Sequence, residues 1–415
     1  MITVAIAGCG SRGMHEYTKD FLTMPDRVKI VAAADIDPEK LRVMRQLCGL
    51  TEAQCYASAE DMLTHDRLAD VLVVATPDEL HYAHAKGALE KNYHLLLEKP
   101  ITPFADQCKE LAQLAQEKQR QVVVCHVLRY TVFYQKIKQI IDSGVLGDIA
   151  SIQALEKVAH WHQAHSFVRG NWRREDTSSC MILAKCCHDM DILLWLTGKK
   201  CLRVSSFGSL MHFKEENAPA GAPARCTDGC PAADTCPYNA VRWYGDRLRA
   251  GKTGWPVNVV CLEPSMDELM HQLRTGPYGR CVYRCDNDVV DHQVVNLELE
   301  GGLTVNFTMS AFTMYGGRTI RVMGTMGELS ADMDKNIIRV SPYIGGEEII
   351  NVNALTNDFS GHGGGDAIMV REFIDLLEGA PMSATLSSID RSVESHLVAL
   401  AAEKSRVNGG AVIEL

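Results

Sequence analysis

The sequence has no long apolar run and no excess of basic residues. No stretch approaches the roughly 18 consecutive apolar residues that suggest a membrane-spanning helix. The 42 Lys and Arg are outnumbered by 52 Asp and Glu, which gives a formal net charge of -10 at pH 7. Proteins that bind nucleic acid or anionic lipid normally present a basic face, so the charge argues against both kinds of partner. A locally basic site for a small anion remains compatible with it.

The N-terminus also lacks the marks of a secretory signal, which are a basic start, an apolar stretch and a small-residue cleavage site. Its first residues, MITVAIAGCGSRG, have the pattern of a strand that enters a glycine turn. The 15 cysteines are an odd number, and several stand singly in apolar segments (Cys48, Cys108, Cys125 and Cys261). This usage favours reduced thiols over a disulfide framework, and we expect a cytoplasmic protein.

Composition and length predict a folded protein of two domains. The hydrophobic share of 46% excludes disorder as the main state, and 415 residues exceed a typical single domain of about 100–200. Residues 1–125 alternate short apolar strands with helical stretches. Because strands of this kind belong to parallel sheets covered on both faces, an N-terminal Rossmann domain with a doubly wound parallel sheet is predicted.

Residues 126–415 have a different pattern. The segment 303–312 alternates apolar and polar residues after a Gly301-Gly302 turn, and long strands are also expected near 149–158 and 204–211. This predicts a C-terminal α/β domain with a large open, mostly antiparallel sheet that has one polar face. Residues 214–260, rich in proline and cysteine, are interpreted as an insertion loop. The exposed sheet face suggests a homodimer or homotetramer.

The N-terminal glycines point to a dinucleotide. Gly8, Gly10 and Gly13 form G-x-G-x-x-G directly after an apolar strand and before a helix, and Ser11 and Arg12 within the motif are further candidates for cofactor contact. The second strand ends at Asp35. A carboxylate there accepts hydrogen bonds from a ribose 2′-OH and repels a 2′-phosphate, so NAD is favoured over NADP. The alternative is a glycine turn without a ligand.

Further motifs follow in a recognisable order. The strand VLVVA runs into Thr76-Pro77 with His81 after it, and Glu98-Lys99-Pro100 ends a later strand. The chain continues with Ile137-x6-Gly144-x2-Gly147-x-Ile149 and then with His188-Asp189-Met190-Asp191. This series resembles the Gfo/Idh/MocA oxidoreductases, which include glucose–fructose oxidoreductase, inositol dehydrogenase and related sugar dehydrogenases. The resemblance covers the first half in motifs and the second half in architecture.

The resemblance implies roles for individual residues. It places Thr76, Pro77, His81, Glu98 and Lys99 at the cofactor, with Lys99 as the active-site lysine beside the nicotinamide. His188 matches the histidine of the family's D-x-x-x-H motif, but the aspartate position is Ala184 here, and Lys185 follows it. This departure puts the usual acid–base arrangement in doubt and suggests that Lys185 contributes to the site. The second domain would supply the substrate pocket and the oligomer contact.

Alcohol oxidation requires a hydride acceptor and a base. A lysine has an ordinary pKa near 10.4 and needs burial or a neighbouring positive charge to act as the base, whereas a histidine near 6.5 needs no adjustment. We therefore predict His188 as base and Lys99 as the group that polarises the hydroxyl, with the converse assignment open. Candidates for substrate contact lie after predicted strands or in a glycine-rich turn: His126, Arg129, Tyr130, His160, Trp161, His162, Arg169, Trp172 and His362. The alternative for the 160–173 segment is an exposed loop with a buried Trp anchor.

A cysteine cluster occupies the insertion. Cys226, Cys230 and Cys236, together with Cys285 or Cys281, could converge on one tetrahedral, structural Zn²⁺. The alternatives are free thiols or an iron–sulfur cluster.

Together these features predict an enzyme that transfers hydride between NAD and a secondary alcohol of a sugar, polyol or glycoside. A second hypothesis is a redox-neutral glycosidase with tightly bound NAD, which works by oxidation, elimination, hydration and reduction. A third is a nucleotide-bound sensor or scaffold without turnover.

Overall fold

The computed structural model describes residues 1–415, except for the side chains of residues 360 and 361. The N-terminal part is built on a six-stranded sheet with the order β3-β2-β1-β4-β5-β6. Every neighbouring pair in it is parallel. Its strands are β1 (Ile2–Ala7), β2 (Val28–Ala34), β3 (Cys55–Tyr56), β4 (Val71–Val74), β5 (His94–Leu97) and β6 (Val122–Val124). The order reverses between β1 and β4, which is where doubly wound sheets bind their ligands.

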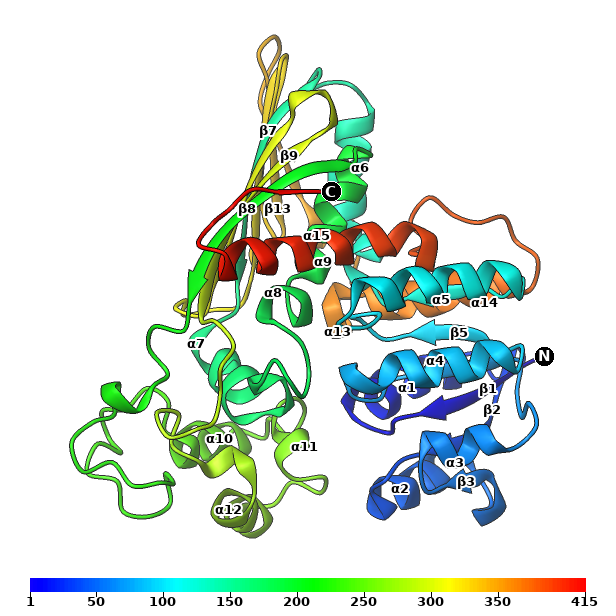
Figure 1. The fold of residues 1–415 in the computed structure, drawn as a ribbon, viewed down its shortest axis with the longest axis vertical. Helices are drawn as coiled ribbons and strands as arrows, with labels where there is room; N and C mark the ends of the chain where they lie inside the picture. Colours follow the sequence, from blue (N-terminus) through cyan, green and yellow to red (C-terminus); the bar gives the residue numbers. More distant parts are fainter.

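Helices cover both faces of this sheet (Figure 1). They are α1 (Thr18–Leu22), α2 (Pro38–Cys48), α3 (Ala59–Thr64), α4 (His81–Glu90), α5 (Ala105–Glu117) and, from the far end of the chain, α14 (Gly365–Leu377). Two apolar cores result, one on each side of the strands. Met369, Val370, Phe373 and Ile374 of α14 belong to the core that also contains Val4 of β1. The chain therefore returns to its first sheet after building the second.

The second sheet has nine strands in the order β14-β13-β12-β11-β7-β10-β9-β8-β15. They are β7 (Ile149–Lys157), β8 (Cys201–Ser209), β9 (His292–Leu299), β10 (Thr304–Ser310), β11 (Gly317–Gly324), β12 (Gly327–Asp332), β13 (Ile337–Pro342), β14 (Glu348–Asn351) and β15 (Ile413–Glu414). All its pairs are antiparallel except β7 with β10. The predicted fold class, a Rossmann sheet followed by a mostly antiparallel sheet, is confirmed.

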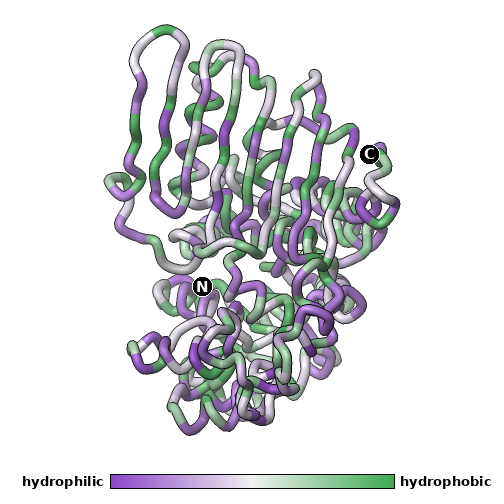
Figure 2. Tube along the Cα trace, turned by 90° about the vertical axis from the view of Figure 1, so that its left-hand side faces the viewer, coloured by the Kyte–Doolittle hydropathy of each residue, from purple (hydrophilic) through white to green (hydrophobic). Residues whose placement is uncertain are grey.

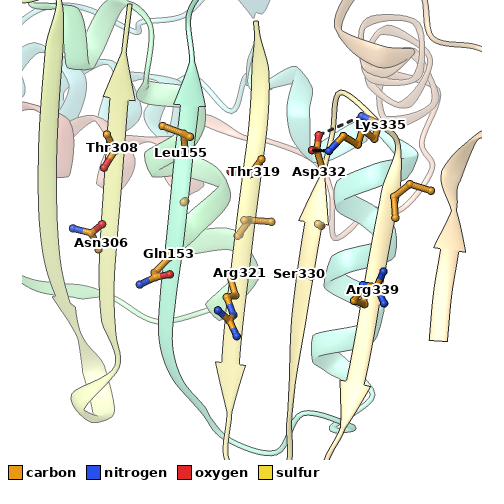
Figure 3. Close-up of a pocket in the computed structure, with 14 residues that line it drawn as sticks. Gln153, Leu155, Asn306, Thr308, Thr319, Arg321, Ser330, Asp332, Lys335 and Arg339 are labelled. Carbon is orange, nitrogen blue, oxygen red and sulfur yellow. Dashed lines mark hydrogen bonds and ion pairs between the residues drawn. The ribbon is translucent and has the colours of Figure 1, made fainter. Parts of the chain in front are cut away.

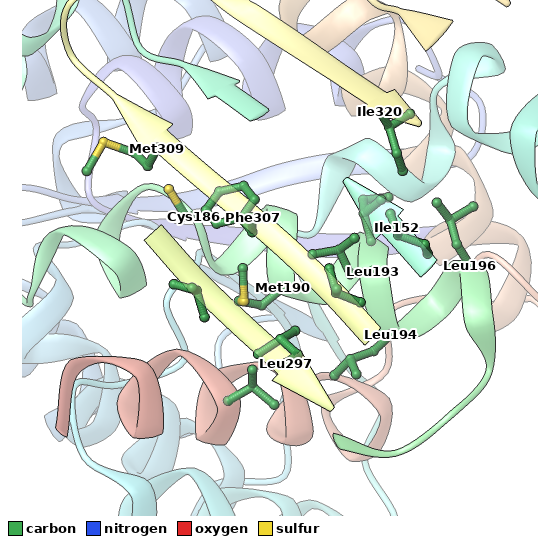
Figure 4. Close-up of a cluster of buried hydrophobic side chains, with 14 of the residues drawn as sticks. Ile152, Cys186, Met190, Leu193, Leu194, Leu196, Leu297, Phe307, Met309 and Ile320 are labelled. Atoms are coloured by element: carbon green, nitrogen blue, oxygen red, sulfur yellow. The ribbon is translucent and has the colours of Figure 1, made fainter. Parts of the chain in front are cut away.

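One face of the second sheet is covered and the other is open. The alternating residues of β9 and β10, such as Leu297 and Phe307, pack against Met190 and Leu193 of α9 (Cys187–Thr197) in a fully buried core (Figure 4). α6 (Val132–Asp142) and α15 (Ile389–Val407) lie on the same side. Figure 2 shows the opposite face with no helix in front of its strands. A broad hollow of about 800 Å³ on that face is lined by polar side chains that include Gln153, Asn306 and Arg321 (Figure 3).

The insertion is more ordered than its composition suggests. Helices α10 (Ala240–Arg249) and α11 (Val257–Val260) lie within the segment predicted to be a loop, and α12 (Met266–Thr275) follows that segment. Tyr244, Leu269 and Leu273 bury their side chains in a small core of their own. The remaining short helices of the second part are α7 (His160–His162), α8 (Met181–Ala184) and α13 (Ser360–Gly363). Among the described residues, none of the helices has the length and apolar character of a membrane span.

Candidate active site

The glycine turn after β1 is shaped by close backbone contacts. Gly8 has a φ of +93°, and a Cβ there would lie 2.4 Å from the carbonyl oxygen of Ala75. A Cβ on Gly13 would lie 2.0 Å from the carbonyl oxygen of Gly8. At Gly10, by contrast, a Cβ would meet no protein atom within 4 Å. The turn thus excludes side chains at its two ends and leaves its middle open to a ligand that approaches the backbone.

Asp35 lies against this turn at the end of β2. Its Oδ2 accepts a hydrogen bond from the Cys9 amide at 2.7 Å, and its Oδ1 accepts one from the Asp37 amide at 2.9 Å. Lys40 places its Nζ 3.9 Å from the same carboxylate. The arrangement fixes a negative charge beside the glycine turn, where a ribose hydroxyl would be a suitable hydrogen-bond donor.

The next two strand ends are tied together by His81. Its Nε2 lies 2.7 Å from the Thr76 carbonyl oxygen and its Nδ1 lies 2.7 Å from the Pro100 carbonyl oxygen. His81 is buried, and both ring nitrogens are engaged by the protein backbone. It therefore positions the loops after Pro77 and around the cis Lys99–Pro100 peptide, rather than offering a nitrogen to a cofactor.

Arg12 joins the glycine turn to two distant segments. Its Nε donates to Glu98 at 2.5 Å, and its Nη2 donates to Asp366 of α14 at 2.5 Å. Glu98 also accepts a hydrogen bond from the Tyr17 hydroxyl. Asp366 in turn accepts from both the backbone amide and Nδ1 of His362. The Arg12 guanidinium holds the pKa of Asp366 far below its usual range against the opposing effect of burial. This ion-pair network links the cofactor turn, the Glu98-Lys99-Pro100 loop and His362.

In the second part of the site, Lys99 reaches the segment that carries His188. Lys99 Nζ donates to the Ala184 carbonyl oxygen at 2.9 Å and lies 5.9 Å from the ring centroid of Trp172. His188 is buried on α9, and its Nδ1 has no hydrogen-bond partner among the described residues. Burial, and then the positive charge of Lys99, hold the pKa of His188 well below 6.5. The imidazole is therefore neutral near pH 7 and able to accept a proton.

Lys185 is held by a buried acid. Its Nζ lies 3.3 Å from Glu156 Oε1, and Glu156 also pairs with Arg318 at 2.9 Å. Arg318 makes two hydrogen bonds to Asp189, the residue after His188. Burial raises the pKa of Asp189 to about 6, although Arg318 opposes the shift. These four groups form a charge network next to α9.

The structure brings together only part of the predicted substrate contacts. The rings of His126 and His362 have their centroids 5.8 Å and 5.9 Å from that of His188. His126 is completely buried, and neither of its ring nitrogens has a hydrogen-bond partner within the described part of the chain. The pKa of His162 lies well below its usual range because of burial and the charge of Lys185. Trp172 donates its Nε1 hydrogen to Asp78 at 3.0 Å, which turns its ring face toward Lys99.

Other predicted contacts are engaged in internal bonds instead. Arg129 is buried in a two-point ion pair with Asp191, at 2.6 and 2.5 Å. The Tyr130 hydroxyl lies 2.9 Å from Ser387 Oγ. Arg169 donates to the backbone carbonyls of Arg280 and Tyr238 and so anchors the insertion, and His160 lies with its Nδ1 3.3 Å from the Thr313 carbonyl oxygen. The guanidinium groups of Arg129 and Arg169 are therefore committed to structural contacts.

Two supporting residues were missed by the sequence analysis. Asp78 accepts hydrogen bonds from Trp172, Ser178 and Ser179, across about 100 residues of chain. His396 of α15 accepts a hydrogen bond from the Ile101 amide at 2.8 Å, and its ring lies 5.4 Å from that of His126. Asp78 follows Thr76-Pro77 directly, which offered a local signal. His396 had none, because its partners are nearly 300 residues away.

The predicted zinc site is not supported. Across residues 1–359 and 362–415, no three His, Cys, Asp or Glu side chains come together in a way that could hold a metal ion. Cys226, Cys230, Cys236 and Cys281 line one small cavity, and Cys285 Sγ instead lies 3.3 Å from the Cys281 carbonyl oxygen. All five are free thiols. The segment is held by apolar packing and by Arg169, so its order has a physical basis without a metal.

Both parts of the chain match known protein families. Residues 2–126 match the model of an oxidoreductase family with an NAD-binding Rossmann fold, and residues 134–255 match the GFO/IDH/MocA C-terminal domain. The Bacillus subtilis (strain 168) oxidoreductase YteT is 22% identical over 92% of this chain and 93% of its own length. Inositol 2-dehydrogenase of Corynebacterium glutamicum (strain R) is 24% identical over 41% of this chain and 48% of that enzyme.

Solved structures share the fold over the whole chain. The WlbA dehydrogenase of Bordetella pertussis, in complex with NADH and UDP-GlcNAcA, has a TM-score of 0.72 at 18% identity and covers 100% of this chain and 97% of its own. An inositol dehydrogenase homologue of Azotobacter vinelandii, complexed with NAD+, has a TM-score of 0.71 at 17% identity with the same coverage.

Proposed function

The chain belongs to the Gfo/Idh/MocA family of NAD-dependent oxidoreductases, and on this basis we propose that it transfers a hydride between NAD and a secondary alcohol of a sugar, polyol or glycoside. The observation that carries the proposal is that Lys99 bonds to the backbone four residues before His188, which is buried and neutral, beyond the edge of an NAD-binding sheet. An ammonium group next to a neutral imidazole suits the removal of a hydroxyl proton.

The residues at the sheet edge fit the dinucleotide. The backbone around Gly10 is open to a phosphate, and the Asp35 carboxylate is placed to accept a hydrogen bond from a ribose hydroxyl. When bound, the nicotinamide supplies the hydride acceptor for alcohol oxidation. Arg12 forms ion pairs with Glu98 and Asp366 and so ties this turn to two distant segments of the chain.

Lys99 and His188 divide the proton chemistry. Lys99 is held by the Ala184 carbonyl and keeps two N–H donors for the oxygen of the reacting alcohol. His188, which burial keeps neutral, accepts the proton as the hydride leaves carbon. Because position 184 is alanine, the site lacks the aspartate of the family's D-x-x-x-H motif, and Lys99 contacts the backbone oxygen of Ala184. The partly exposed His362 lies next to His188 and adds a polar group for substrate hydroxyls, whereas His126 is buried.

The test is an assay of NADH formation with a panel of inositols, aldoses, methyl glycosides and disaccharides. Lys99→Ala is expected to reduce turnover by about 100-fold or more while NAD binding, measured by calorimetry, survives. Lys109→Ala, an exposed lysine on α5, is the matched control and should behave as wild type. A fully active Lys99→Ala variant would overturn the assignment.

The same assay separates oxidation from the redox-neutral glycosidase reaction. That reaction would release sugar without net accumulation of NADH. None of the relatives described above favours it, since they are named as dehydrogenases or oxidoreductases. Sugar release from a glycoside without added NAD⁺ would replace the dehydrogenase proposal with this one.

A further inference from the structure

Aromatic rings gather where the insertion meets the 160–169 segment. This aromatic cluster consists of Trp161, His162, His165, Trp243, Trp255 and Tyr278. Trp161 stacks on Trp243 with ring centroids 5.0 Å apart. Trp255 lies 5.5 Å from Trp161 and meets His162 edge-on at 4.9 Å. The proposed hydride transfer makes no use of Trp243, Trp255 or Tyr278.

The aromatic cluster is continuous with the catalytic residues. The His162 ring lies 5.8 Å from that of Phe167, and the Phe167 ring lies 6.2 Å from that of Trp172. Lys99 Nζ sits over the Trp172 ring at 5.9 Å. An unbroken series of ring contacts therefore runs from Trp255 to the lysine of the site.

The outer end of the cluster is accessible, and a guanidinium lies on two of its rings. Trp255 is 41% exposed, although a side chain of this size is normally well buried. Arg247 places its guanidinium 4.7 Å from the Trp243 centroid and 5.4 Å from the Trp161 centroid. An exposed tryptophan at the end of a ring stack that also carries a guanidinium is the chemistry that binds the C–H face and the hydroxyls of a sugar.

We propose that the aromatic cluster is a second carbohydrate subsite, which binds the ring joined to the one that is oxidised. The substrate class is then a disaccharide or a longer glycoside rather than a free monosaccharide or an inositol. The proposal rests on the proposed function for the reacting ring. A single exposed tryptophan offers an apolar contact about as wide as one sugar ring, which suits a sugar better than a protein surface of several hundred Å².

Steady-state kinetics with matched sugars test the subsite. Cellobiose, maltose and lactose are compared with the corresponding methyl monosaccharides for wild type, Trp255→Ala and Trp255→Phe. Trp255→Ala is expected to raise KM for the disaccharide about 10-fold relative to KM for its monosaccharide, since it removes the stacking face of the second ring. Trp255→Phe should restore most of this ratio. The control is Phe104→Ala, which removes a 60% exposed ring at the N-cap of α5. It should leave the ratio of the two KM values unchanged.

The outcomes distinguish the subsite from the activity. If wild type oxidises disaccharides in preference to monosaccharides and Trp255→Ala removes that preference, the subsite is supported. An equal change of KM for both sugars, no change in either, or a wild type that oxidises only monosaccharides would refute the subsite while the proposed function stands. If wild type neither oxidises nor binds any of these sugars in the presence of NAD⁺, as followed by tryptophan fluorescence, both proposals fail.

Discussion

Substituting Gly10 by alanine separates cofactor binding from folding. Gly10 has a φ of −79°, which alanine adopts without strain, and a Cβ there meets no protein atom within 4 Å. The folded protein without ligand should therefore be as stable as wild type. The added methyl group nevertheless projects from the turn at which the pyrophosphate must approach the backbone. The variant should lose affinity for NAD and nothing else.

The loss of NAD affinity in Gly10→Ala can be estimated from the cost of crowding a methyl group against the ligand. Forcing a methyl group into a close contact costs about 1–3 kcal/mol, which corresponds to an increase of about 5- to 150-fold in the Kd for NAD. Calorimetry measures this increase directly. Thermal unfolding gives a second readout: at a concentration 100 times the wild-type Kd, NAD stabilises the fold by about 2.7 kcal/mol, and a tenfold weaker variant would gain only about 1.4 kcal/mol.

Two further glycines supply the controls. Gly13→Ala would put its Cβ 2.0 Å from the Gly8 carbonyl oxygen, so it should lower the melting temperature even without NAD. Gly346 lies between β13 and β14, and a Cβ there would meet no protein atom within 4 Å. Gly346→Ala should therefore change neither the Kd for NAD nor the melting temperature. A Gly10→Ala variant that binds NAD as tightly as wild type would refute the placement of the phosphates at this turn.

Three other predictions follow from the site and the open sheet face. Asp35→Asn removes the charge that repels a 2′-phosphate, so the ratio of kcat/KM for NAD to that for NADP should fall about tenfold or more, and an unchanged ratio would show that Asp35 does not select the cofactor. Because burial keeps the pKa of His188 well below 6.5, its proton-accepting form persists as the pH falls, and the kcat/KM profile should lack an acid limb near pH 6.5; such a limb would contradict a buried, neutral base. If the chain forms a homodimer or homotetramer through the open face of the second sheet, Asn306→Arg on that face should shift its mass in light scattering toward the monomer, and a monomeric wild type would refute the interface.

The fold was predictable where its signals are local. The apolar strand, the glycine motif and Asp35 follow one another within 35 residues, and each has a distinct residue pattern. The strand β10 after the Gly301-Gly302 turn was equally clear from its alternation of apolar and polar residues. What the sequence could not show is that β7 lies between β10 and β11 and runs parallel to β10, since no local pattern specifies a partner about 150 residues away. Helix α10 was obscured by the prolines and cysteines before it, although Ala240 and Tyr244 have helical spacing.

For the site, residue type alone did not separate ligands from structural groups. Arg129 was predicted to contact substrate because it follows a strand at the carboxyl edge of the sheet. Its acidic partner, Asp191, lies 62 residues later, and only the fold reveals the pair. The neutral state of His188 likewise depends on burial by segments far apart in the chain. The motif residues Lys99 and His188 do come together, through the contact between Lys99 and the carbonyl of Ala184.

The return of α14 to the first sheet has a practical consequence for experiments with fragments. Phe373 and Ile374 fill part of the interior beneath β1, so a polypeptide cut after residue 125 would present that apolar surface to water. Such a fragment would be prone to self-association, and a failure to observe nucleotide uptake by it would say nothing about the intact enzyme. Chimaeras with related dehydrogenases should accordingly exchange residues 1–125 and 365–377 as one unit.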